Sequence, residues 1–187
     1  MNIVVQTYDG RVQCRPDTSW EREDRDLFAP DFISAYDFVP VLFARICKAG
    51  KCVGGKFADR YYDAVNYGIL LDAITVSGEP IRIMDRTSVL PFPMYDRVTL
   101  ENGDNIFSLR LDSGNGPREI WSTCAGSTSM VESAICNVSG YVSLRTGDIV
   151  AVCLSGGRHL ISREESGTAA ISGTFCGNML FDFNIVM

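Results

Sequence analysis

The chain has 187 residues and a net charge of −6, with 46% hydrophobic and 21% charged residues. This composition is that of a globular protein and excludes a disordered chain. An acidic balance without a basic cluster argues against nucleic-acid binding, and the short apolar runs argue against a membrane span. Because the N-terminus lacks the features of a secretion signal, we expect a cytoplasmic protein with one domain over residues 1–187.

The first 34 residues are expected to form a hairpin and then a charged segment. Residues 3–8 and 11–14 read as two short strands around Asp9-Gly10, a pair typical of a tight hairpin turn. Residues 19–26 are mostly charged, which indicates a solvated loop or a short helical turn.

The core of the chain is expected over residues 39–76. Residues 39–46 form an apolar run typical of a strand buried on both faces. After a polar turn, apolar residues recur at helical spacing from Phe57 to Val65 and predict a helix. Gly68 closes this helix, and a second strand follows over residues 69–76. Three prolines then predict irregular chain over residues 80–94, with at most a short strand at 81–84.

The C-terminal half is expected to consist of strands and a second helix. Residues 127–138 predict this helix because their apolar residues share one face, with Ser129 and Glu132 at the spacing of a capping box. The pattern predicts a hairpin with strands at 98–100 and 105–112, joined by a turn at 101–104. It also predicts strands at 118–122, 148–154, 159–162, 169–175 and 178–186. The predicted fold class is therefore α+β, dominated by β-structure, with two helices.

The cysteines and the single histidine do not form a recognisable reactive set. The seven cysteines have no metal-binding spacing, and we expect free, mostly buried thiols. His159 lies in a turn-like Gly-Gly-Arg-His sequence without a nucleophile motif. A Ser/His/Asp or Cys/His catalytic device is therefore not expected.

A family resemblance is carried by residues in the middle of the chain. They are Arg45-Ile46, Lys48, Gly50-Lys51, Phe57-Ala58, the run Arg-Tyr-Tyr-Asp-Ala-Val at 60–65, and Gly68-Ile69. In this order they resemble the core of the fumarylacetoacetate hydrolase (FAH) family, bacterial members most of all. The resemblance implies a β-roll like the family's C-terminal domain over residues 35–187, a divergent N-terminal segment over 1–34, and a homodimer.

The resemblance also implies where a metal would be bound. Enzymes of this family hold a small oxo-acid through magnesium or manganese, and these cations need hard oxygen ligands. The resemblance places three ligand positions on Val39, Val41 and Leu70, and all three are aliphatic here. Burying a bare cation among hydrocarbon would be costly. The leading hypothesis is therefore a non-catalytic relative, or pseudoenzyme, that needs no cofactor. It would act as a binding or scaffolding subunit, with an active FAH-family paralogue as a candidate partner.

Two alternatives stay open. Asp37, Asp72 and Asp85 could form a displaced carboxylate site. The protein would then be a divergent metal-dependent hydrolase, decarboxylase or isomerase of a small oxo-acid, with magnesium or manganese as cofactor. In the other alternative, a metal-free pocket binds a small anionic metabolite. Its residues would be Arg82, Ser155, Gly156, Gly157 and Arg158.

Overall fold

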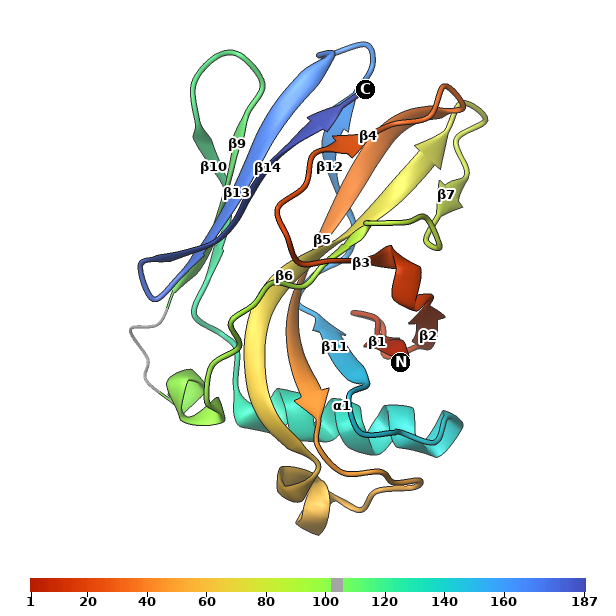
Figure 1. The fold of residues 1–187 in the computed structure, drawn as a ribbon, viewed down its shortest axis with the longest axis vertical. Coiled ribbons are helices and arrows are strands. Elements are labelled where there is room, and N and C mark those ends of the chain that lie inside the picture. The colour runs from red at the N-terminus through yellow and green to blue at the C-terminus, as the bar shows by residue number, and fades with distance from the viewer. Residues whose placement is uncertain (102–105) are drawn as a thin grey trace.

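The computed structural model describes residues 1–101 and 106–187, which form two β-sheets and a single α-helix (Figure 1). The larger sheet contains β1 (Ile3–Gln6), β2 (Val12–Arg15), β3 (Trp20–Glu21), β5 (Ile33–Ile46), β6 (Tyr62–Thr75), β7 (Pro80–Ile81), β8 (Ser88–Val89), β11 (Ile149–Cys153) and β12 (Arg158–Ser162). The smaller sheet runs in the order β10 (Arg118–Thr123), β9 (Phe107–Asp112), β13 (Thr168–Phe175), β14 (Asn178–Val186) and β4 (Leu27–Phe28). The helices are α1 (Thr128–Tyr141) and three short 3-10 helices, η1 (Asp17–Ser19), η2 (Gly55–Arg60) and η3 (Arg97–Glu101). The expectation of a β-dominated α+β fold is confirmed.

Two long antiparallel strands, β5 and β6, form the central ribbon of the larger sheet, and each has 14 residues. Their register places Val39 opposite Leu70 and Asp37 opposite Asp72. Side chains alternate between the two faces of a strand. In β6, therefore, Leu71 packs in the main core, whereas Leu70 belongs to a second apolar cluster on the other face.

The two apolar clusters lie on opposite faces of the larger sheet. The main core fills the space between this sheet, the smaller sheet and α1. The second cluster is small, and its buried members are Ile3, Val5, Val39, Val41, Phe43, Leu70, Leu90, Ile149, Ala151 and Cys153. Most of its members come from strands β1, β5, β6 and β11, which are far apart in the chain, and they pack against one another on this face of the larger sheet.

Strand β5 changes its pairing partner along its length on one side. The first part of β5 pairs with β12 and the last part with β11, and residues 154–157 connect the two partners. Pro40 lies at this change of partner, and its carbonyl accepts a hydrogen bond from the Leu154 amide at 2.8 Å. Because a proline has no N–H to donate, a gap in pairing is a position where a central strand tolerates one.

The N-terminal hairpin is confirmed. β1 and β2 are antiparallel, and Gly10 in the turn has a φ of +82°, which suits glycine. β1 also runs parallel to β11, with Val5 opposite Ala151. The hairpin is therefore an integral part of the larger sheet.

The helix expected from Phe57 to Val65 is largely wrong. Only the 3-10 helix η2 forms, it ends at Arg60, and β6 begins at Tyr62. Both faces of β6 are covered, so most residues of the strand are buried and apolar, and the spacing of its first residues matches a helix by coincidence. Gly68 is an interior residue of β6, because a Cβ atom there would collide with the carbonyl oxygen of Val89 on β8.

Other local expectations are partly corrected. Residues 98–100 form part of η3 rather than a strand, and most of the turn expected at 101–104 lies outside the described residues. The strand expected at 81–84 is only β7. Helix α1 confirms the second predicted helix, but its N-cap is Ser127, whose hydroxyl accepts a hydrogen bond from the Met130 amide at 3.3 Å. The four C-terminal strands are confirmed to within two residues.

The charged segment is not uniformly solvated. Glu21 is buried, and its carboxylate accepts hydrogen bonds from the amides of Arg22 and Glu23 and pairs with Arg25 at 3.3 Å. A buried carboxylate with these partners fixes the turn after β3.

The close approach of β8 to β6 predicts the effect of a glycine substitution. Gly68→Ala should lower the free energy of unfolding by about 2 kcal/mol or more, because the added methyl group overpacks the strand against backbone. Urea unfolding followed by tryptophan fluorescence measures this change. Gly140→Ala, near the end of α1 with open space around its Cβ position, is the matched control. It should be neutral or mildly stabilising. Equal effects of the two substitutions would contradict the prediction.

Candidate ligand pocket

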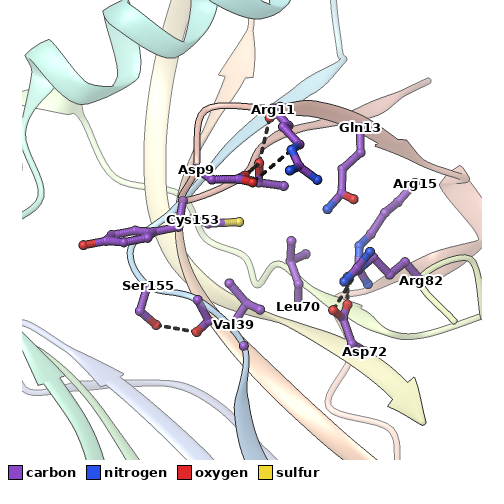
Figure 2. Close-up of a pocket in the computed structure, with 14 residues that line it drawn as sticks. Asp9, Arg11, Gln13, Arg15, Val39, Leu70, Asp72, Arg82, Cys153 and Ser155 are labelled. Carbon is purple, nitrogen blue, oxygen red and sulfur yellow. Dashed lines mark hydrogen bonds and ion pairs between the residues drawn. The ribbon is translucent and has the colours of Figure 1, made fainter. Parts of the chain in front are cut away.

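A cavity of about 260 Å³ lies between the N-terminal hairpin and the β5–β6 ribbon (Figure 2). Four parts of the chain line it: the hairpin, the ribbon, the residue after β7 and the loop after β11. The lining residues are Thr7, Tyr8, Asp9, Arg11, Gln13, Arg15, Val39, Leu70, Asp72, Arg82, Cys153, Ser155, Gly156 and Gly157.

One wall of the pocket is hydrocarbon. Val39 and Leu70 are cross-strand partners in the ribbon, and both line the cavity. Val41 lies two residues further along β5 and packs in the same apolar cluster. The three positions that the family resemblance assigns to metal ligands are therefore neighbours in space, and their side chains offer no ligand atom.

A buried charged group lies at one end of this wall. A terminal guanidinium nitrogen of Arg15 donates to one carboxylate oxygen of Asp72, and Arg82 Nε donates to the other oxygen at 2.8 Å. The Arg15 side chain is only 1% exposed, and its other terminal nitrogen donates to the Leu71 carbonyl at 2.9 Å. Burial lowers the pKa of Arg15, while the charge of Asp72 opposes that shift. Both oxygens of Asp72 are thus occupied by guanidinium groups.

The second arm of the N-terminal hairpin supplies a row of polar side chains across from the apolar wall. Arg11, Gln13 and Arg15 are spaced by two residues, so that they share the face of the hairpin that turns to the pocket (Figure 2). Arg11 pairs with Asp9 at 3.0 Å, and Asp9 accepts a hydrogen bond from the Thr7 hydroxyl. This hydrogen bond, together with the charge of Arg11, lowers the pKa of Asp9.

The other end of the pocket is formed by the chain that leaves β11. Cys153 is buried, and burial raises the pKa of its thiol to about 12. The thiol is therefore neutral and behaves as an apolar lining group rather than a nucleophile. Ser155, Gly156 and Gly157 follow it and form the polar rim on this side.

The structure brings together four of the five residues of the predicted anion pocket. Arg82, Ser155, Gly156 and Gly157 line the cavity. Arg158 is not among the lining residues, because its guanidinium lies over the Trp121 ring, 4.6 Å from the ring centre.

The three candidate displaced carboxylates do not converge. Asp72 lines the pocket, but Asp85 lines a separate surface hollow with Leu27 and Phe28. The carboxylate of Asp37 lies 3.6 Å from Nδ1 of His159, on the side of β5 that pairs with β12.

The single histidine is engaged by carboxylates. His159 Nε2 lies 2.8 Å from Glu165, and this contact lowers the pKa of that carboxylate. The cysteines differ from expectation: five are exposed, Cys136 is half-buried, and only Cys153 is buried. Exposed thiols were not expected because cysteine usually behaves as a small buried apolar residue.

Sequence reasoning missed the contribution of the N-terminal hairpin. The alternation of Arg11, Gln13 and Arg15 in a predicted strand was a signal that these polar side chains share one face. Only the fold, however, places that face against Asp72, which is 57 residues from Arg15 in the chain.

The side chains at this site do not fit a divalent cation. Magnesium and manganese need several oxygen ligands with open lone pairs. Here three expected positions are aliphatic, and Asp72 already bonds two guanidinium groups. Within residues 1–101 and 106–187, no group of three His, Cys, Asp or Glu side chains lies close enough to hold a metal ion. The expectation that the protein needs no cofactor stays a prediction.

Comparisons with known proteins give matches at the level of structure. No protein-family model matches the chain, and no curated protein sequence matches it significantly. A solved structure described as a candidate FAH-family protein from Yersinia pestis superposes with a TM-score of 0.68 at 17% identity, covering 99% of this chain and 92% of that one. Fumarylpyruvate hydrolase from Pseudomonas aeruginosa, solved with Mn²⁺ and pyruvate, gives 0.70 at 16% identity, covering 100% and 90%. Maleylpyruvate hydrolase from Sphingobium sp. SYK-6 gives 0.69 at 15%, covering 99% and 70%.

These likenesses establish the fold. The chain has the fold of FAH-family proteins, as the sequence resemblance implied. No helix among the described residues is long and apolar enough to cross a membrane.

The buried pair of Arg15 and Asp72 predicts a large loss of stability when one partner is removed. Arg15→Leu should lower the free energy of unfolding by about 3 kcal/mol, because it leaves a buried carboxylate with one partner fewer. Chemical unfolding measures this loss. Arg11→Leu, on the same face of the hairpin but at an exposed pair, should leave stability unchanged within error. If both variants behave alike, the pair has no special role in stability.

The raised pKa of Cys153 predicts its reactivity. At pH 8 the folded protein should react with iodoacetamide at its exposed cysteines and leave Cys153 unmodified, because a thiol with a pKa of about 12 is almost entirely protonated. Peptide mass spectrometry after timed labelling reports each site. All seven cysteines should react once the chain is unfolded in guanidinium chloride. Rapid native labelling of Cys153 would contradict the assignment.

Proposed function

We propose that this protein is a non-catalytic relative of the FAH family that acts as a binding or scaffolding subunit. The single observation that carries the proposal is the pairing of Val39 with Leu70 at the wall of the central pocket. In the family, the resemblance implies oxygen ligands at these positions. Here the pocket wall at these positions is hydrocarbon.

The state of Asp72 supports the same proposal. A carboxylate that ligates a cation must offer a lone pair, and each oxygen of Asp72 already accepts a hydrogen bond from an arginine. Displacing Arg15 would strand a buried guanidinium, which is costly. The guanidinium groups of the buried Arg15 and the half-exposed Arg82 thus balance the negative charge of Asp72 that a metal would otherwise balance.

The competing function is that of a metal-dependent enzyme. Its support is that two carboxylates, Asp9 and Asp72, both line the pocket, and that a neighbour in structure is a fumarylpyruvate hydrolase solved with Mn²⁺ and pyruvate. Under this alternative the protein would be a hydrolase, decarboxylase or isomerase of a small oxo-acid. The arginine partners of both carboxylates argue against it.

Partners and location are part of the proposal. A homodimer and an active FAH-family paralogue are the proposed partners, and the cytoplasm is the proposed location. Light scattering of the purified protein tests the dimer, and affinity capture from the native cell tests the paralogue. If the protein is a monomer and captures no such paralogue, the scaffolding role is excluded and ligand binding is the function that is left.

Metal titration separates the two functions. Calorimetry of the purified protein with MnCl₂ and MgCl₂, alone and with pyruvate, should give no stoichiometric binding in the micromolar range, because the pocket lacks open oxygen ligands. Acylpyruvate substrates should not be cleaved with either metal present. Micromolar Mn²⁺ binding that is lost in Asp72→Asn would contradict the proposal and place a relocated metal site at that carboxylate.

A further inference from the structure

The pocket has an excess of positive charge within an acidic protein. Three arginines (Arg11, Arg15 and Arg82) and two aspartates (Asp9 and Asp72) line it, which gives a formal local charge of +1, whereas the whole chain carries −6. Arg11 and Asp9 compensate each other at 3.0 Å. The excess charge therefore belongs to the group in which two arginines share one carboxylate.

Arg15 has an unused hydrogen-bond donor in this group. Its Nε is buried and has no hydrogen-bond partner among the described residues, while its terminal nitrogens are bonded to the protein. Buried donors in folded proteins nearly always have partners, and the exceptions need an explanation. Because this atom has no accessible surface, a molecule in the cavity does not reach it directly, and the unpaired donor adds positive potential to the arginine end of the cavity.

Arg82 provides accessible donors at the same end. Only its Nε is hydrogen-bonded, to Asp72, and its terminal nitrogens make no hydrogen bond within the described part of the chain. Its side chain is 48% exposed, so it lies at the rim where a molecule enters. A guanidinium with open nitrogens binds a carboxylate in a planar, two-pronged geometry.

The wall of the pocket on the ribbon side favours a hydrocarbon body. Figure 2 shows Val39 and Leu70 between the arginine group and the Cys153–Ser155 end. Cys153 adds a buried thiol to this apolar surface. A molecule held at the arginines would lay its other end on hydrocarbon, and oxygen atoms there would lose hydrogen bonds to water without replacement.

We infer that the pocket binds a small aliphatic monocarboxylate without a metal, with its carboxylate on Arg82 beside the buried Arg15 and its hydrocarbon on Val39 and Leu70. The inference rests on the proposed function, because it requires a pocket that works without a cation. The ligand class differs from the oxo-acids that metal-dependent relatives hold, since the wall formed by Val39 and Leu70 offers no donor to an oxo oxygen. One negative charge is expected, because it balances the local excess of one.

Calorimetry of the whole chain with isovalerate tests the inference. Isovalerate should bind in metal-free buffer and raise the melting temperature, since a ligand bound only by the folded state stabilises it. 3-Methylbutan-1-ol, which has the same hydrocarbon without the charge, and malonate, which has two charges and little hydrocarbon, should each bind at least tenfold more weakly. Equal binding of the alcohol, or tighter binding of malonate, would overturn the inference.

Arginine variants localise the binding. Arg82→Gln should weaken isovalerate binding at least tenfold, and Arg82→Lys should weaken it less, because a lysine keeps the charge but loses the two-pronged geometry. Arg158→Gln is the matched control, since this arginine lies over Trp121 outside the pocket, and it should leave binding unchanged. Circular dichroism confirms that the variants fold. Unchanged binding in Arg82→Gln would overturn the inference.

A parallel titration with 2-oxoisovalerate separates this inference from the proposed function. Binding of the oxo-acid only in the presence of Mn²⁺ would overturn the proposed function and the inference together. Absence of isovalerate binding, with no metal binding either, would overturn the inference alone. Metal-independent binding of isovalerate that depends on Arg82 supports both.

Discussion

The ion pair between Arg15 and Asp72 joins two parts of the larger sheet that are far apart in the chain. Arg15 ends β2, Asp72 lies near the end of β6, and both side chains are nearly excluded from solvent. Buried charges are tolerated only when they are paired and hydrogen-bonded. The hairpin therefore has a preferred position against the ribbon, and the pocket between them has a defined shape. Arg82 adds a second guanidinium to the same carboxylate and closes the group toward solvent.

The proposed function is that of a chain that keeps the fold of FAH-family proteins without their metal chemistry. The ribbon places Val39, Val41 and Leu70 on the enclosed face, where they complete an apolar layer with strands β1 and β11. Fold resemblance to hydrolases does not determine activity, because activity depends on the groups at the site. In this chain the pocket combines a wall of hydrocarbon with arginine side chains, and the proposed binding of an amphiphilic anion rests on that combination.

Most strands could be predicted from the sequence, and the central failure has a physical cause. Hairpin β1–β2 and the C-terminal strands follow from alternation and turn residues, which are local signals. The sequence predicts a helix that includes residues 62–65, which begin β6, because a strand buried on both faces has no alternation to distinguish it. In the pocket, Arg82, Asp72 and the 155–157 loop could be identified in advance. Arg15 could not, because its partner is fixed only by tertiary structure.

The parallel pairing of β1 with β11 has a consequence for how the protein is made. Residues 3–6 are synthesised long before residues 149–152, which are their parallel partners in the sheet. On the ribosome, the N-terminal hairpin must therefore wait for most of the nascent chain before it can dock, and contacts between distant segments form slowly. Until then the apolar cluster that contains Val39 and Leu70 lacks its members on β11. A chaperone that recognises exposed apolar strands would meet this protein during translation rather than after it.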